Sequence, residues 1–110
     1  MQRVDADFKN RVYSLVAQIP MGRVMSYGQV AALCGNPLAA WEVGQIAHTG
    51  PTDLPWQRVV NKHGGLAIGW PYGGLAAHKA ALEGDGVVVS EDYKVAVDLL
   101  WWPEGFDVER

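Results

Sequence analysis

The sequence contains a single cysteine, Cys34, among its 110 residues, which excludes internal disulfide bonds and indicates a reducing compartment. It also lacks any apolar run of the ~20 residues that a membrane-spanning helix requires. Residues 1–5 do not show the basic-then-apolar pattern of a secretion signal. We therefore predict that residues 1–110 form a single cytoplasmic domain, monomeric and without a membrane partner.

Charged residues are few as well, at 19% of the chain, whereas hydrophobic residues make up 49%, and this composition excludes the disordered class. The net charge is −3, which argues against tight binding to a phosphate backbone. The charge is uneven, because residues 91–110 hold six acidic residues against two basic ones. Residues 1–90 hold six acidic residues against seven lysines and arginines. Any binding of nucleic acid is expected to be weak and sensitive to salt.

Apolar positions spaced three and four residues apart predict a first helix near the N-terminus. Asp5 or Asp7 is expected to cap it, and Pro20 and Gly22 to end it. Its inner face is predicted to consist of Phe8, Val12, Leu15, Val16 and Ile19.

Two shorter helices are predicted next. Ser26 is expected to cap a helix over residues 27–33, and a third helix follows over residues 38–49. Gly35 lies in the turn between them and is suited to a left-handed conformation. Two short helices joined by a tight turn with a glycine are typical of a helix-turn-helix.

The second half of the chain is predicted to contain a small β-hairpin or wing. Residues 59–60 and 66–68 would be its strands, with residues 61–65 as the turn. A helix is expected over residues 75–83. Residues 87–89 and 93–99 are candidate strands. The predicted fold class is mainly α with a small β-hairpin, a winged helix-like helix-turn-helix domain.

Few residues carry reactive chemistry. Cys34 follows the second predicted helix with no histidine beside it, and a lone cysteine there most often behaves as a small buried apolar residue. The histidines, His48, His63 and His78, show no metal-ligand spacing, and there is no phosphate-binding glycine motif. Neither a metal nor a cofactor is expected.

The third predicted helix has two distinct faces. Trp41, Gln45 and His48 fall at i, i+4 and i+7 and share one side, whereas Val43 and Ile46 lie on a side suited to packing. An aromatic ring, an amide and an imidazole on one outward face can contact nucleic acid. The alternative is that Trp41 packs into the core and the other two form ordinary solvated surface.

Residues 55–60 carry a resemblance to a known family. Pro55-Trp56-Gln57-Arg58-Val59-Val60 resembles the Pro-Cys-His-Arg-Val active-site motif of the O6-alkylguanine-DNA alkyltransferases, with Trp56 in place of the reactive cysteine. Other motifs follow the order and approximate spacing of that family: Ser26-Tyr27-Gly28-Gln29-Val30-Ala31, Gly35-Asn36-Pro37, Val43-Gly44-Gln45 and Gly73-Gly74-Leu75. The ordered set covers roughly residues 8–86. The chain is similar to the alkyltransferase-like proteins, the branch of the family that lacks the cysteine.

The resemblance implies the fold of the alkyltransferase C-terminal domain and a recognition helix that enters the minor groove. The DNA-binding residues that it implies are Tyr27, Ala39, Ala40, Trp41 and Gln45. Tyr27 would press on the phosphate beside the target and help to rotate the nucleotide outward, and the two alanines would permit close approach. Trp41 stands where the family has an arginine finger. An indole can fill a vacated base stack but brings no positive charge, so weaker DNA binding is expected.

The resemblance also implies a pocket for an extruded O6-alkylguanine. A damaged base pair costs less to open than an intact one. Tyr72 would replace a hydroxyl donor near the guanine oxygen, and Trp56 and Trp70 would adjoin the alkyl group. Two alternatives stay open, a core role for Trp56 and a structural hydrogen-bonding role for Arg58. The predicted pocket residues are Tyr27, Trp56, Arg58, Val59, Gly69, Trp70 and Tyr72.

These features predict a DNA damage-recognition protein that is not an enzyme. An acceptor thiol needs a neighbouring base, and this chain has Trp56 and Gln57 at the two positions. The expected partners are double-stranded DNA containing O6-alkylguanine and, as the resemblance implies, nucleotide excision repair proteins. A second hypothesis is a protein-interaction module that kept the fold and lost most DNA binding. A third is an enzyme that uses Cys34.

Overall fold

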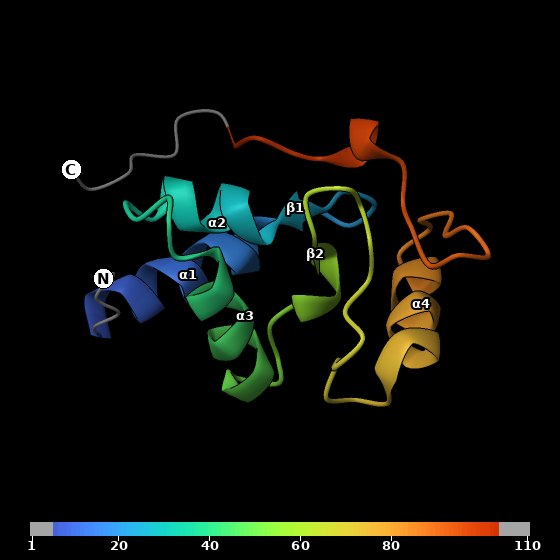
Figure 1. Cartoon of the computed structure of the whole chain (residues 1–110), viewed down its shortest axis with the longest axis horizontal. Helices are drawn as coiled ribbons and strands as arrows, with labels where there is room; N and C mark the ends of the chain where they lie inside the picture. Colours follow the sequence, from blue (N-terminus) through green and yellow to red (C-terminus); the bar gives the residue numbers. More distant parts are fainter. Residues whose placement is uncertain (1–5, 104–110) are drawn as a thin grey trace.

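The computed structural model describes residues 6–103. In Figure 1 the helices of the N-terminal half lie at one end of the molecule and the helix Gly74–Gly84 lies at the other, with the strands between them. The elements are, in chain order, α1 (Ala6–Gln18), β1 (Met25–Ser26), α2 (Tyr27–Leu33), α3 (Ala40–Thr49), a 3-10 turn η1 (Trp56–Arg58), β2 (Val59–Val60), α4 (Gly74–Gly84) and a 3-10 turn η2 (Val97–Leu99). The predicted class, a mainly helical domain with a minor sheet, is confirmed.

The three N-terminal helices form because their inner positions are apolar, and α2 is also capped at its start. The predicted inner face of α1 is fully buried. At the start of α2, the Gln29 amide N–H donates to Ser26 Oγ at 3.0 Å, and the Ser26 N–H donates to Gln29 Oε1 at 2.8 Å. This reciprocal capping box satisfies two backbone donors that the helix cannot pair, so α2 begins at Tyr27 as predicted.

The turn between α2 and α3 ends α2, and it moves the start of α3 to a later residue than the sequence predicts. Gly35 has φ +92°, its N–H donates to the Ala32 oxygen at 3.1 Å, and the Asn36 N–H donates to the Ala31 oxygen at 2.9 Å. These bonds form the glycine-terminated cap that the sequence predicts. The Ala39 N–H then donates to the Asn36 oxygen at 3.0 Å, so α3 starts at Ala40, two residues after its predicted beginning.

The predicted β-hairpin is wrong, because β2 pairs with β1 instead of with residues 66–68. The pairing is parallel and joins Met25 to Val59 and Ser26 to Val60. Both strands are buried on both faces, and such strands pair where burial is greatest, not with the segment next in sequence. Ile68, on the other side of the turn, is exposed and gains no burial from pairing.

The turn at residues 61–65 exists, but it leads to a different partner. The Asn61 N–H donates to the Gly65 oxygen at 2.9 Å, after which the Leu66 N–H donates to the Tyr93 oxygen at 3.0 Å. Gly65 pairs with Lys94 in an isolated antiparallel bridge. Residues 87–89 and 93–99 form no regular strand, so the two candidate strands of the C-terminal part are also wrong.

The sheet separates two apolar cores. Met25 and Val59 point towards α1, α2 and α3, whereas Val24 and Val60 belong to the core beside α4. Alternate residues of a strand face opposite sides, so two short strands supply both cores. The chain after η2 returns to β1, where Val24 bridges Leu100 and the Trp101 N–H donates to the Val24 oxygen at 2.8 Å. Among residues 6–103, every helix is too short or too polar to cross a bilayer.

Candidate nucleic-acid interface

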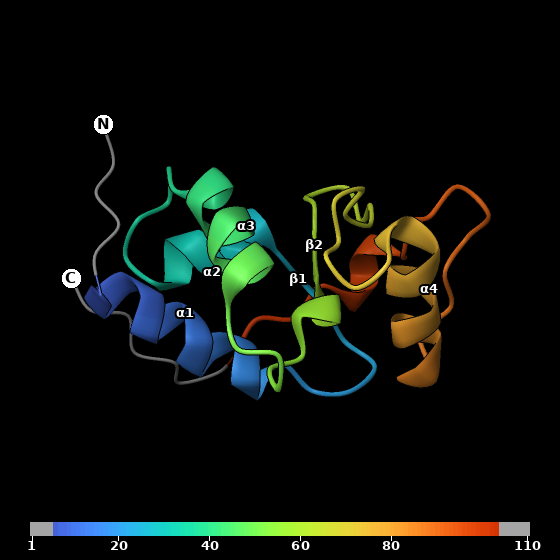
Figure 2. The same cartoon turned by 90° about the horizontal axis from the view of Figure 1, so that it is seen from below.

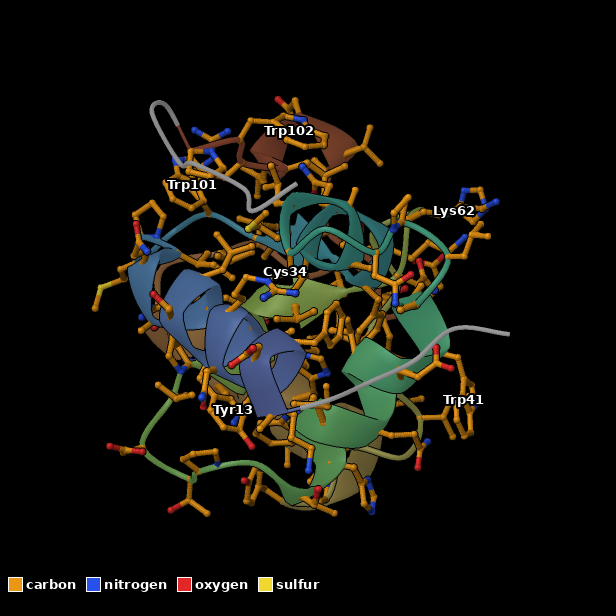
Figure 3. All side chains as sticks on the ribbon, turned by 90° about the vertical axis from the view of Figure 1, so that its left-hand side faces the viewer. Tyr13, Cys34, Trp41, Lys62, Trp101 and Trp102 are labelled. Carbon is orange, nitrogen blue, oxygen red and sulfur yellow. The ribbon has the colours of Figure 1, made fainter. Side chains whose placement is uncertain are left out.

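The exposed face of α3 carries the side chains that the sequence predicts. The side chain of Trp41 is 70% exposed, Gln45 and His48 are exposed, and Val43 and Ile46 on the opposite side are buried in the first core. Figure 3 shows Trp41 projecting away from the body of the molecule, with Lys62 of the 61–65 turn projecting to the same side. Trp41 therefore does not pack into the core, and a lysine that the sequence analysis did not single out lies on its side of the molecule.

The two alanines that precede Trp41 differ in position. Ala40 is partly exposed at the first turn of α3, where a small side chain leaves room for a close neighbour. Ala39 is fully buried and packs in the first core. Ala39 therefore has no surface to offer to DNA, and the expectation for Ala39 is wrong, whereas a contact between Ala40 and DNA stays a prediction.

A cavity of about 40 Å³ lies beside this face. Tyr27 comes from the start of α2, Trp56 from η1, and the remaining walls come from the inner side of α3 and from the loop before α4. Burial raises the pKa of Tyr27, so its phenol stays protonated and can donate a hydrogen bond. The residues that line the cavity are Tyr27, Gly44, Ala47, His48, Trp56, Ala67, Gly69, Trp70 and Pro71.

Trp56 belongs both to the core and to the cavity. Its side chain is 3% exposed, packs in the first core and meets the Tyr13 ring edge-to-face, with 6.1 Å between the ring centroids. Its indole N–H donates to the Pro51 oxygen at 2.7 Å, and Gly50 packs so closely that a Cβ there would lie 2.7 Å from the ring. The ring is thus fixed as a wall of the cavity.

Three predicted pocket residues lie outside the cavity lining. Val59 is buried within the sheet, behind Trp56, because its side chain supplies the first core. Tyr72 is exposed, and its ring meets the ring of Trp70 edge-to-face at 4.9 Å. Arg58 points away from the cavity, and its guanidinium is used entirely in structural contacts. These three assignments to the pocket are corrected; Tyr27, Trp56, Gly69 and Trp70 do line it.

Arg58 connects three segments of the chain. Its Nε and Nη2 donate to the two carboxylate oxygens of Asp85 at 2.9 and 3.2 Å, and its Nη1 donates to the Ile19 oxygen at 2.9 Å. The hydrogen bonds from Arg58 hold the pKa of Asp85 below its ordinary value. These contacts support the structural alternative for Arg58.

The residues at the motif positions carry no nucleophile or base. The Gln57 side-chain amide donates to Asp85 Oδ2 at 3.2 Å, and an amide cannot act as a base. Cys34 is fully buried in the first core, and burial raises the pKa of its thiol to about 11. A thiol that is both inaccessible and protonated at neutral pH is a poor nucleophile.

His78 is a buried residue whose role the sequence analysis missed. Its Nδ1 accepts from the Ala67 N–H at 3.1 Å, so its Nε2 carries the proton and donates to the Gln57 oxygen at 2.9 Å. Its ring stacks on Trp70, with 5.0 Å between the centroids and 15° between the planes. Its place on the inner face of α4, three residues after Leu75, was the available signal.

We expect folding stability to fall as the pH drops below 6.5, the ordinary pKa of histidine. Burial lowers the pKa of His78 in the folded protein, so below pH 6.5 the unfolded chain binds a proton that the folded protein does not. The loss continues until the pH passes the lowered pKa. Urea unfolding at pH 7.5 and pH 5.5 measures it. His78→Gln should remove most of this pH dependence, whereas His63→Gln, which alters an exposed histidine, should keep it. Equal pH dependence in all three proteins would contradict the assignment.

Within residues 6–103, no three histidine, cysteine, aspartate or glutamate side chains lie close enough together to hold a metal ion.

Comparison with known proteins gives consistent matches. The family model for the 6-O-methylguanine DNA methyltransferase DNA-binding domain matches residues 7–87. A DNA base-flipping protein of Escherichia coli is 39% identical over 104 residues, which cover 93% of this chain and 78% of that protein. Alkyltransferase-like protein 1 of Schizosaccharomyces pombe is 35% identical, over 88% of this chain and 96% of that protein. The crystal structure of the S. pombe alkyltransferase-like protein with damaged DNA containing O6-carboxymethylguanine superposes with a TM-score of 0.81, at 35% identity, over 93% of this chain and 100% of that chain.

Proposed function

The chain belongs to the family of the 6-O-methylguanine DNA methyltransferase DNA-binding domain and, within it, to the alkyltransferase-like proteins, and from this premise we propose that it recognises O6-alkylguanine in double-stranded DNA without repairing it. The protein docks α3 in the minor groove, rotates the damaged nucleotide out of the duplex and holds its base in the cavity beside Trp56. It then marks the site for nucleotide excision repair.

One observation carries this proposal. The helix that presents Trp41 and Gln45 to the outside also supplies Gly44, Ala47 and His48 to the wall of the cavity. A base that leaves the stack beside Trp41 therefore reaches the cavity along the same helix. Extrusion costs a few kcal/mol of stacking and pairing, and this cost is smallest for a damaged base pair.

Alkyl transfer is not part of the proposed function. Trp56 occupies the motif position at which the alkyltransferases have their acceptor cysteine, and Gln57 occupies the position of the histidine. Cys34, the remaining thiol, is buried with a raised pKa. Incubation with DNA that carries a labelled O6-methyl group should leave no label on the protein, and Cys34→Ser should behave in the same way.

Fluorescence anisotropy with matched duplexes tests the proposal. A duplex with one O6-methylguanine should bind roughly tenfold or more tightly than the same duplex with guanine. Both affinities should fall between low and moderate salt, because contacts with the phosphates weaken as salt rises. Equal, very weak binding of both duplexes would contradict the proposal and favour the protein-interaction module.

Trp41→Ala is expected to weaken lesion binding by about tenfold or more. A base stacked on an aromatic side chain gains roughly 1–3 kcal/mol, and Trp41 is exposed at the start of α3, where it can fill the gap that the rotated nucleotide leaves. The same anisotropy titration measures the loss.

Trp102→Ala is the matched control, because Trp102 is also an exposed tryptophan, 59% exposed, and Figure 3 shows it at a different edge of the molecule. It should leave the affinity unchanged. Trp41→Arg should tighten binding, since arginine restores a charge near the phosphates and a donor for the unpaired base. If Trp41→Ala binds as tightly as the unaltered protein, the wedge role is wrong.

A further inference from the structure

Trp70, in the loop before α4, is held through both its backbone and its ring. Its backbone N–H donates to the Ala67 oxygen at 3.3 Å, and its backbone oxygen accepts from the Gly74 N–H at 2.9 Å. One face of its ring stacks on His78 at 5.0 Å, and Tyr72 meets it edge-to-face at 4.9 Å. His78 is itself fixed by two hydrogen bonds, so the direction of the Trp70 indole is set before any ligand arrives.

The indole N–H of Trp70 is buried, and no residue of the described range 6–103 accepts a hydrogen bond from it. A buried donor without an acceptor costs free energy, and proteins pair nearly all such groups. The indole N–H of Trp56, by contrast, is satisfied by the Pro51 oxygen. Trp70 lines the cavity, so a ligand that widens the cavity and displaces the atoms that cover this N–H can supply the missing bond.

A ligand that fits this cavity needs a hydrogen-bond acceptor with an apolar group beside it. An indole N–H can only donate, and Tyr27 keeps its phenolic proton. Ala47, Ala67 and Pro71 add apolar surface. O6-alkylation of guanine suits this set, because it adds an apolar group and removes the N1 proton, which turns N1 from a donor into an acceptor. N7 is an acceptor in both bases.

We propose that the Trp70 indole N–H is a specificity-determining donor, which binds the unprotonated N1 of the extruded O6-alkylguanine. This inference rests on the proposed function and names the group that reads the base. A bond to N1 selects the alkylated base directly, because the N1 proton of guanine would oppose the indole N–H. A bond to N7 would give no such selection, because N7 is an acceptor in both bases.

The cavity must widen before a purine fits, since about 40 Å³ holds only a few water molecules. His48 is exposed on the α3 side and can rotate outward, whereas Trp70 is tethered through its backbone and through His78. The base therefore enters against a fixed donor, and little ordering is needed to form the bond.

The test combines Trp70→Phe with modified lesions in an anisotropy titration. Phenylalanine keeps an aromatic ring to stack on His78 but removes the N–H. We expect Trp70→Phe to bind O6-methylguanine duplex about tenfold more weakly, and Trp102→Phe to bind it like the unaltered protein. The 1-deaza analogue of O6-methylguanine lacks N1, so Trp70→Phe and the unaltered protein should bind it with equal affinity, whereas the 7-deaza analogue should keep the tenfold difference.

Two results would overturn the proposal: unchanged binding of O6-methylguanine by Trp70→Phe, or an equal loss against both deaza analogues. If Trp70→Phe does not fold, the unaltered protein still tests the proposal. It should bind the 1-deaza analogue more weakly than O6-methylguanine and should bind the 7-deaza analogue as tightly. A failure of the proposed function looks different, since the unaltered protein would then not prefer O6-methylguanine over guanine at all.

Discussion

Arg58→Ala is expected to lower the free energy of unfolding by about 3 kcal/mol, because it removes one partner of a buried ion pair. The side chains of Arg58 and Asp85 are 14% and 9% exposed, and the substitution leaves the Asp85 carboxylate with a single donor, Gln57. It also leaves the Ile19 oxygen without its side-chain donor. For a chain of this length the melting temperature should fall by roughly 10–20 °C. Urea and thermal unfolding measure both quantities.

Lys94→Ala is the matched control, because Lys94 and Asp92 form an exposed ion pair at 4.0 Å, and exposed pairs contribute little. Its stability should be unchanged. Acid unfolding gives a second readout, since the lowered pKa of Asp85 stabilises the fold above its ordinary value of 3.8, and this contribution is lost as the pH falls through the lowered pKa. Arg58→Ala should weaken that acid-dependent part. If it instead leaves stability intact and abolishes lesion binding, Arg58 contacts the DNA and our structural assignment is wrong.

Gly64→Ala should destabilise the protein by about 3–4 kcal/mol, because two penalties fall on one residue. Gly64 has φ +84°, a left-handed conformation that costs an L-residue roughly 1–2 kcal/mol. A Cβ at this position would also overlap the backbone oxygen of Val95, and backbone cannot move aside as a side chain can. Overpacking of this kind typically costs a further 1–3 kcal/mol. Urea unfolding measures the sum.

Gly86→Ala separates the two penalties. Gly86 has nearly the same φ, +85°, but a Cβ there would meet no atom within 4 Å of it. We expect a loss of only about 1 kcal/mol, from the left-handed conformation alone. Equal losses for the two variants would mean that the 61–65 turn does not press against residues 93–95, and the pairing that replaces the predicted hairpin would then be in doubt.

The proposed site places aromatic rings where charged groups would be expected in a DNA-binding protein. The resemblance implies that Trp41 stands at the position of an arginine finger, and Trp70 carries an unpaired indole N–H beside the cavity. Stacking and a fixed hydrogen bond depend on contact, whereas attraction to phosphates acts at a distance and weakens with salt. Because the net charge is −3, the protein should associate slowly with DNA. Its selectivity should come from its contacts with the extruded base.

Local signals determined much of the fold. The spacing of apolar residues placed α1, α2, α3 and α4, and the Ser26 cap and Gly35 marked their boundaries to within two residues. These features were readable because helix periodicity and helix caps involve residues only three to five positions apart. The outward direction of Trp41 followed from the same periodicity.

The sequence by itself determined the family and the four helices, since each follows from neighbouring residues or from an ordered set of motifs. Only the tertiary structure decided that β2 pairs with β1, that Arg58 binds Asp85, that Ala39 is buried, and that His78 supports Trp70. Each of these joins segments that are distant in the chain or depends on which side of an element becomes buried. Contacts of this kind depend on the packing of the whole domain, and no local sequence pattern predicts them.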